Sequence, residues 1–554
     1  MDVYRQGKKV RLTQAEFKAQ GGEGAVYVAG DTAYKVYADP AKMIPVAKIK
    51  ELSALELRSI VRPQDILLDA ARTPIGYTMQ SVPDSVGLCS TFTPAFKQRV
   101  GLTPEKVLHL VKQFQEGIAY VHSRGILIVD LNEMNFLVDL GFKQIYFIDV
   151  DSYQTPHFPA TALMESVRDR QASGWNSGTD WFSFAVVSFQ MFAGIHPYKG
   201  RHPSVKTLDA RMQQNLSVLH PDVSLPGVCP PLSGIPRAYF DWYQAVFEQG
   251  KRTAPPSGIP IAISNRMVLT PTSAGSGHFT ISKWHELAGT VVSFTRGFTV
   301  TTEAVYSEKQ RCRDVGANAV LGLSPVSRSG VLAFLEHGCV SLFDLTRQKS
   351  LPFSMTAEQL SAADGRVYAK QGGSLLEVSF VETPTQVWAS AKIVGTVLEH
   401  ATQLFEGVAL QNLLGAWYAS LLPETARCYQ VKLPELDGFQ VIHAKFEGGI
   451  LMVVAAKADR FQKLIFRFSC DYSTYDVRVI SDIATYGINF VVLDLGLCLH
   501  LSGEGDLEIF PAKQGAPALK TLTDPALGGG CLLLKDGSQA LFARDNTLYR
   551  LATK

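Results

Sequence analysis

Two acidic side chains and one amide lie in the middle of the chain at a spacing suited to chemistry on phosphate groups. Asp130 and Asn135 are five positions apart within D-L-N-E-M-N, and Asp149 follows fourteen residues after Asn135. Transfer of a γ-phosphoryl group to a hydroxyl needs a magnesium ion held by a carboxylate and an amide, and a second carboxylate that orients the hydroxyl. The spacing therefore predicts Asp149 and Asn135 as metal ligands and Asp130 as the catalytic base.

Two alternatives remain open at this point. The segment D-L-N-E-M-N is also compatible with an ordinary turn, because Asp and Asn side chains often bond their own backbone. Asp151 lies two positions after Asp149, and either carboxylate is a candidate for the main metal ligand.

A glycine-rich turn and a lysine near the N-terminus favour the chemical interpretation. Residues 20 to 27 read Q-G-G-E-G-A-V-Y and residues 33 to 37 read A-Y-K-V-Y, which predicts a strand, a turn and a second strand. Glycines allow backbone amides to approach phosphate oxygens, and Lys35 would supply a point charge to them. Such a turn alone is typical of ordinary hairpins, but the order of turn, lysine, Asp–Asn loop and metal aspartate is not.

Residues 1 to about 258 resemble a bacterial protein-kinase-like domain, in the branch with D-L-N-x-x-N and D-x-D-S-[FY]-Q motifs. The matching segments are 130 to 135 and 149 to 154. The resemblance implies an α+β bilobal kinase-like fold that uses ATP and Mg²⁺. It implies Asp130, Lys35, Asn135 and Asp149 as catalytic residues, Asn135, Asp149 and Asp151 as metal ligands, and Gly21, Gly22, Gly24, Val26, Lys35, Glu51, Met79, Gln80 and Val82 as the ATP site.

The resemblance also implies several pairings. Glu51, or alternatively Glu56, would pair with Lys35. Arg252 would pair with Glu165, and Asp180 would cap a buried helix and bond the catalytic-loop backbone. These pairings are expectations that depend on the resemblance.

The triplet before the catalytic loop departs from the kinase pattern. Val129 stands where an arginine would bind an activating phosphate. Valine cannot form that ion pair, so we expect activity that does not require phosphorylation of the following segment.

Beyond residue 260 the sequence changes to short apolar or alternating runs bounded by Gly, Asp and Asn, for example 331 to 335 and 450 to 454. Such runs are typical of strands. Their spacing predicts an all-β domain, either a six- or seven-bladed β-propeller or a pair of β-sandwiches. Prolines and small residues at 251 to 260 predict the boundary, so the expected domains are 1–258 and 259–554.

Composition excludes several classes of protein. Lys plus Arg number 53 and Asp plus Glu 51, for a net charge of +2, so we expect neither a nucleic-acid nor a membrane-surface partner. The eight cysteines show no C-x-x-C spacing, which disfavours zinc sites and a disulfide framework and fits a reducing cytoplasm. The start of the chain lacks an apolar core and the longest apolar run is too short to span a bilayer, so we expect no signal peptide or transmembrane segment.

The expected function is that of an ATP- and magnesium-dependent serine/threonine protein kinase whose β-propeller docks a protein substrate or regulator. By resemblance, von Willebrand-type or phosphatase proteins are possible partners. The alternatives are a pseudokinase scaffold and a small-molecule kinase. The four residues Lys35, Asp130, Asn135 and Asp149 favour the enzyme, because a scaffold has no chemical reason to keep all of them.

Overall fold

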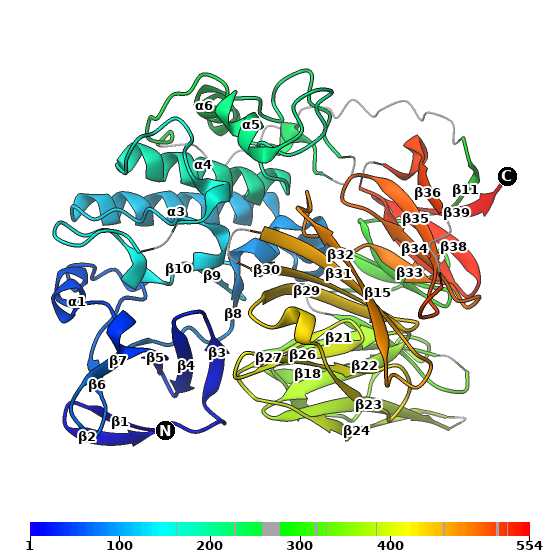
Figure 1. Ribbon diagram of the computed structural model, residues 1–554. Helices are drawn as coiled ribbons and strands as arrows, with labels where there is room; N and C mark the ends of the chain where they lie inside the picture. Colours follow the sequence, from blue (N-terminus) through cyan, green and yellow to red (C-terminus); the bar gives the residue numbers. More distant parts are fainter. Residues whose placement is uncertain are drawn as a thin grey trace.

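The computed structural model describes residues 1–161, 163–226, 229–257, 277–315, 319–327, 329–383, 385–457, 460–516, 520–528 and 530–554. Three regions follow one another along the chain (Figure 1). They are an N-terminal sheet, a group of helices, and a series of small sheets that extends to the C-terminus.

The N-terminal sheet has seven antiparallel strands in the order β2-β1-β6-β7-β5-β4-β3. The hairpin of β4 and β5 places Lys35 opposite Val26, and β7 places Tyr77 beside Lys35 on the other side. The strands are β1 (Asp2–Arg5), β2 (Lys8–Arg11), β3 (Phe17–Gln20), β4 (Gly24–Ala29), β5 (Thr32–Tyr37), β6 (Ile66–Leu68) and β7 (Pro74–Gln80).

Six α-helices are present among the described residues: α1 (Val46–Leu52), α2 (Pro94–Val100), α3 (Pro104–Ser123), α4 (Ser177–Ala193), α5 (Leu208–Gln213) and α6 (Arg237–Phe247). Thr103 caps α3 through the Lys106 amide, with Pro104 at the first helical position. Asn176 and Thr179 form a capping box at the start of α4. Nearly every side chain of α4 is buried, as expected for a helix that is apolar on all sides.

A three-stranded sheet, with one strand before α3 and two after it, borders the polar loop predicted above. Its order is β10 (Ile145–Phe147), β9 (Phe136–Asp139) and β8 (Ser85–Gly87). The short 3-10 helices are η1 (Pro40–Lys42), η2 (Leu88–Phe92), η3 (Glu133–Asn135), η4 (Val150–Ser152), η5 (Glu165–Val167), η6 (Leu232–Gly234), η7 (Pro434–Leu436) and η8 (Pro525–Leu527). Phe136 at the start of β9 pairs with Phe147 at the end of β10, so η3 and η4, with the acidic residues next to them, lie at the same end of this sheet.

In the described part of the C-terminal region there are seven separate antiparallel sheets. The first strand of the region, β11 (Phe279–Glu286), pairs with the last, β39 (Thr547–Thr553), so that the two ends of the region share one sheet. The runs predicted at 331 to 335 and 450 to 454 lie within the strands β17 and β30.

The remaining strands, sheet by sheet, are as follows. The sheet of β11 and β39 also contains β38 (Gln539–Arg544) and β37 (Leu532–Asp536). The second sheet contains β12 (Val291–Thr295), β13 (Phe298–Thr301), β14 (Ala304–Ser307) and β15 (Gln310–Asp314), the third contains β16 (Val320–Leu323), β17 (Gly330–Glu336), β18 (Cys339–Asp344), β19 (Lys349–Ser350) and β20 (Met355–Thr356), and the fourth contains β21 (Gln359–Ala363), β22 (Arg366–Gln371), β23 (Ser374–Glu382) and β24 (Val387–Thr396). The fifth contains β25 (Thr402–Phe405), β26 (Val408–Leu413), β27 (Ala416–Leu421) and β28 (Tyr429–Lys432), the sixth contains β29 (Gln440–Glu447), β30 (Ile450–Lys457), β31 (Arg460–Phe468) and β32 (Tyr475–Ser481), and the seventh contains β33 (Phe490–Val492), β34 (Leu497–Leu501), β35 (Asp506–Pro511) and β36 (Lys520–Thr523).

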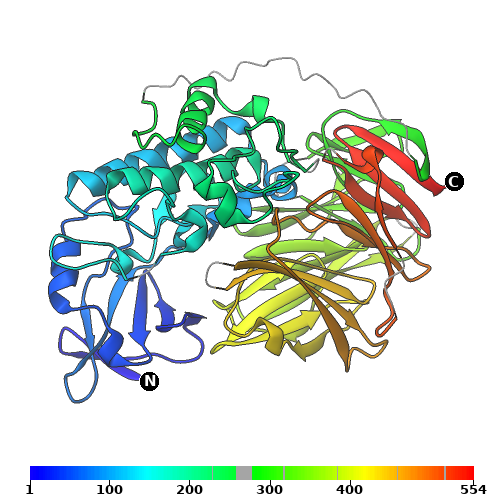
Figure 2. The ribbon, with the colours of Figure 1, turned by 45° about the horizontal axis from the view of Figure 1, so that its top comes forward.

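The helices and the small sheets share one apolar cluster, which contains side chains of α3, α4 and α6 together with side chains of β29 to β31 and β33 to β35. Figure 2 shows the helices bordering these sheets. Tyr486 lies at the centre of the contact, with ring centroids 5.9 Å from Phe92 and 4.4 Å from Phe461. The two regions therefore bury part of their apolar surface against each other.

The predicted fold class is wrong for this structure. The chain is mostly β, with 42% of residues in strands and 18% in helices. Many small antiparallel sheets and one half-barrel sheet dominate the structure. The expected α+β bilobal kinase-like fold would instead have a helical lobe. The physical reason is that short alternating runs recur through more than half of the chain, whereas only a few segments have helical periodicity.

Two other predictions concern the chain as a whole. The boundary expected between residues 258 and 259 lies outside the described residues. None of the helices in the described ranges combines the length and the apolarity that a bilayer crossing needs.

Candidate functional site

Lys35 is the cation at the centre of the site. It lies on β5, and its side chain is 12% exposed. Its Nζ is 2.5 Å from Asp151 Oδ2, 3.4 Å from Glu23 Oε2 and 3.6 Å from Asp149 Oδ1. Burial opposes the charge, but the two aspartates outweigh it and raise the pKa of Lys35, so the lysine is held as a cation.

The loop after α3 is fixed by a buried carboxylate. Asp180, at the start of α4, accepts hydrogen bonds from the backbone amides of Ile128 (2.8 Å) and Val129 (2.9 Å), and also lies 2.9 Å from His122 Nε2. Val129 has φ of 64°, which is costly for a β-branched residue. The bonds to Asp180 therefore hold a strained turn immediately before Asp130.

Asp130 and Asn135 contact each other directly. Asn135 Nδ2 donates to the backbone oxygen of Asp130 at 2.9 Å and to its Oδ2 at 3.2 Å, which leaves Asn135 Oδ1 available as an acceptor. The Met164 amide donates to Asp130 Oδ1 at 2.7 Å, and Asp130 is 7% exposed. The segment after η4 thus covers this carboxylate.

Asp149 is brought beside this loop by the end of β10, because the Ile148 amide donates to the Asn135 carbonyl at 3.0 Å. Asp149 has left-handed backbone, with φ of 59°, and its side chain is 37% exposed. Loss of hydration and the neighbouring Asp151 raise the pKa of Asp149 to about 7, against the opposing effect of Lys35.

The donor set fits magnesium in its usual form. Among the described residues there is no group of three or more His, Cys, Asp or Glu side chains arranged to hold a metal. However, Mg²⁺ usually takes one or two protein ligands and fills its other positions with water and phosphate. The Asp149 carboxylate and the Asn135 amide oxygen form such a set.

The glycine turn connects β3 and β4 in the N-terminal sheet, which also contains β7. The Gly21 amide donates to the Gly24 carbonyl at 2.9 Å, which makes the turn tight. A Cβ on Gly24 would lie 2.2 Å from the Val36 carbonyl oxygen, whereas one on Gly22 would meet nothing within 4 Å. Four further residues predicted for the ATP site lie on or after β4 and β7. Val26 lies opposite Lys35, Met79 and Gln80 lie opposite Ala33 and Thr32, and Val82 lies in the loop from β7 to β8.

Three expected pairings differ in the structure. Glu51 lies 2.7 Å from His157 Nδ1, and Lys35 takes its carboxylates from elsewhere. Arg252 binds Asp169 with two hydrogen bonds of 2.5 and 2.7 Å, while Glu165 pairs with Arg168 and Arg170. Asn176, and not Asp180, caps α4, whereas the expected bonding of Asp180 to the loop backbone is confirmed. In each case the partner lies in a segment with little periodicity, where the sequence does not fix the register.

Sequence reasoning did not find three residues of the site. Tyr37 donates to Asp151 Oδ2 at 2.9 Å, and its position two residues after Lys35 on one strand face was an available signal. Lys48, on α1, is 1% exposed. Glu133 lies within the loop and accepts a 2.8 Å hydrogen bond from Tyr486, a contact between distant segments that no local pattern indicates.

Comparison with known proteins gives one partial match. The chain is 26% identical over 203 residues to Ribosomal protein S6 kinase 2 beta of Xenopus laevis. The aligned region covers 33% of this chain and 31% of that protein. No family model matches the chain. The chain thus spans about a third of the length of the curated relative it matches, and the similarity indicates a kinase-like region.

Proposed function

We propose that the protein is an ATP- and magnesium-dependent phosphotransferase that acts on serine or threonine hydroxyls of proteins. The observation that carries this proposal is the meeting of Lys35, Asp149 and the Asp130–Asn135 pair at one site, from β5, the end of β10 and the loop after α3. A cation, a carboxylate–amide pair and a second carboxylate are what phosphoryl transfer to a hydroxyl needs.

Each residue has a role that follows from its chemistry. Lys35 would bind the phosphate oxygens as a point charge, and the amides of the tight turn at Gly21 to Gly24 would approach them. Asp149 and Asn135 would hold magnesium, which neutralises charge on the phosphates when bound. Asp130 would orient the acceptor hydroxyl and take its proton.

In the proposed role Asp130 would accept a hydrogen bond from the substrate hydroxyl, and its Oδ1 now accepts one from the Met164 amide. A substrate hydroxyl would therefore replace this amide as the donor to Asp130. Catalytic hydrogen bonds often form only in the complex with substrate, so this contact is compatible with the role of Asp130.

The proposal assigns a different function to each of the two regions of the sequence. Residues 1–258 would carry the phosphoryl chemistry, and the small sheets of 259–554 would bind a protein substrate or regulator. Support comes from the positions of Lys35, Asp130, Asn135 and Asp149, which all lie in the first of these regions.

The test is incubation of the full chain with radiolabelled ATP and Mg²⁺, with and without generic protein acceptors such as casein. Transfer of label to protein is expected. Asp130→Asn is expected to lower the rate about 100-fold or more, because general base catalysis contributes about 10² to 10⁴. The matched control is Asp222→Asn, whose side chain is 65% exposed; no transfer by the wild type, or equal rates for the two variants, would contradict the proposal.

A further inference from the structure

The nearest carboxylate to Lys35 comes from the segment that follows β10. Asp151 Oδ2 lies 2.5 Å from Lys35 Nζ, and the Asp151 side chain is 5% exposed. The other two carboxylates near Lys35 are longer contacts and far more exposed, Asp149 at 37% and Glu23 at 54%. A buried ion pair is screened much less than an exposed one, so Asp151 is the dominant counterion.

The same oxygen of Asp151 has a second donor. Tyr37 lies two residues after Lys35 on β5, and its hydroxyl donates to Asp151 Oδ2 at 2.9 Å. Two donors of β5 therefore share one buried carboxylate oxygen. A metal ion on this oxygen would have to displace both donors and approach an ammonium group.

Helix α1 supplies no carboxylate to Lys35. Its only charged side chain that is buried is Lys48, which is 1% exposed and donates one hydrogen bond, of 3.3 Å, to the Pro159 carbonyl. Glu51, one turn later, pairs with the exposed His157. The helix thus contributes a buried cation and no carboxylate for Lys35, and the negative partner of Lys35 comes from another element.

We propose that Asp151 is a positioning residue that holds Lys35 at the phosphate site, and that Asp149 alone of the two aspartates binds the metal. This inference rests on the proposed function, because it assigns the two carboxylates of that site to different tasks. Asp151 acts through Lys35 and does not contact the phosphates.

The first experiment measures Lys35 without nucleotide. Trace acylation at pH 9, followed by peptide mass spectrometry, reports how much of the amine is neutral, with the exposed Lys206 as internal reference. Asp151→Asn is expected to raise the acylation rate of Lys35 about tenfold or more, the effect of one pKa unit. Asp149→Asn is expected to raise it less, and Glu51→Gln to leave it unchanged.

Three results of this experiment would overturn the inference. They are no change in Asp151→Asn, an equal or larger rise in Asp149→Asn, and a further rise of about tenfold in Asp149→Asn on addition of Mg²⁺. The last measurement does not use Asp151→Asn, so it decides the question even if that variant does not fold. Metal binding to Asp151 would release Lys35, and we expect no such release.

The second experiment is a double-mutant cycle on ATP binding in EDTA. Lys35→Met and Asp151→Asn are each expected to weaken binding about tenfold, and the double variant no further, because Asp151 acts through Lys35. Additive losses would overturn the inference. Absence of ATP binding by the wild type would instead contradict the proposed function, and the acylation result would stand independently of it.

Discussion

At the scale of single residues, the site depends on polar groups whose hydrogen bonds fix their direction. Asn135 uses its Nδ2 on Asp130, so its Oδ1 is directed elsewhere. Asp180 bonds two consecutive amides of a strained turn. A polar atom that already has hydrogen-bond partners is less available for another ligand. The proposed roles of Asp149 and Asp151 differ for this reason, because Asp151 Oδ2 already accepts from Lys35 and Tyr37.

Asp149→Ala should abolish phosphoryl transfer because it removes the partly exposed carboxylate that follows β10 beside Asn135. We expect a loss of about three orders of magnitude or more in rate, the scale of removing one strong electrostatic contact to the transition state. The measurement is the rate of label transfer at several Mg²⁺ concentrations. Full activity at high Mg²⁺ would show that Asp149 is not the main ligand.

His196 predicts a dependence of stability on pH. It is buried, its Nε2 donates to the Ser166 carbonyl, and its Nδ1 accepts from the Tyr198 amide, so the ring must be neutral. Burial lowers its pKa from 6.5 to about 3. Between these values the unfolded chain binds more protons, so stability falls as the pH falls below 6.5, by about 1.4 kcal/mol per pH unit for one proton.

The check is the melting temperature of the wild type and of His196→Gln at pH 7.5 and 5.0. The decrease between the two conditions should be smaller in the variant. His157→Gln is the control, because the His157 side chain is 79% exposed, and it should keep the decrease of the wild type. Equal decreases in all three proteins would exclude His196 as the titrating group.

At the scale of elements, the hairpin of β4 and β5 links the glycine turn to Lys35. Gly24 is paired with Tyr37 across the hairpin, and the Val36 carbonyl fills the space where a side chain would begin. Only glycine allows the two strands to approach this closely. Strand packing at Gly24 therefore fixes the turn that would bind phosphate. At Gly22, in the same turn, there is room for a side chain.

Gly24→Ala should destabilise the hairpin and weaken ATP binding, whereas Gly22→Ala should change stability little. We expect a decrease in melting temperature of about 3 °C or more for Gly24→Ala, equivalent to at least about 1 kcal/mol. Thermal unfolding and ATP titration of both variants make the comparison. Equal effects at the two positions would show that the close approach to Val36 has no energetic weight.

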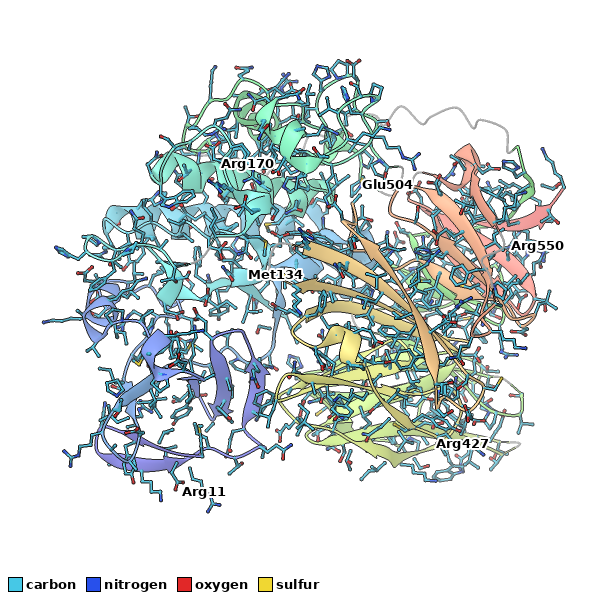
Figure 3. All side chains as sticks on the ribbon, in the orientation of Figure 1. Arg11, Met134, Arg170, Arg427, Glu504 and Arg550 are labelled. Carbon is cyan, nitrogen blue, oxygen red and sulfur yellow. The ribbon has the colours of Figure 1, made fainter. Side chains whose placement is uncertain are left out.

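At the scale of the whole molecule, the small sheets contact the polar loop directly. Tyr486 donates to Glu133, which lies between Asp130 and Asn135, and the contact is buried. Lys199 reaches Asp482 and Ile483, and Arg201 reaches Glu504 and Asp506. Figure 3 shows Met134 and Glu504 where the two regions meet.

Tyr486→Phe should lower both stability and the rate of phosphoryl transfer. It leaves a buried acceptor on Glu133 without this donor, at a cost of about 1 to 3 kcal/mol, within the loop that holds Asp130. Tyr475→Phe is the matched control, because Tyr475 also donates to a glutamate, Glu435, but within the small sheets. Equal transfer rates in the two variants would show that the sheets do not influence the loop.

A chain that ends at residue 257 should associate or aggregate, because it exposes the helix surface that now packs against β29 to β35. Exposed apolar surface of that kind drives association. Size-exclusion chromatography of the truncated and full chains is the measurement. A monomeric, active fragment would show that the shared apolar cluster is not needed by the N-terminal region.

The sequence by itself determined which residue types could do chemistry, and which segments form strands. The Asp130–Asn135 spacing, the glycine turn with Lys35 and the short runs beyond 260 are local patterns, and local patterns are set by backbone sterics and side-chain periodicity. The fold class was wrong because the way sheets and helices assemble is not local.

Only the tertiary structure decided the partners. Lys35 and Asp151 are 116 positions apart, and Glu133 and Tyr486 are 353 apart, so no spacing rule connects them. A buried charge must find whichever opposite group packing brings within reach, since leaving it unpaired is costly. The resemblance therefore implied a glutamate of the helical run for Lys35, while packing supplied an aspartate from the segment after β10.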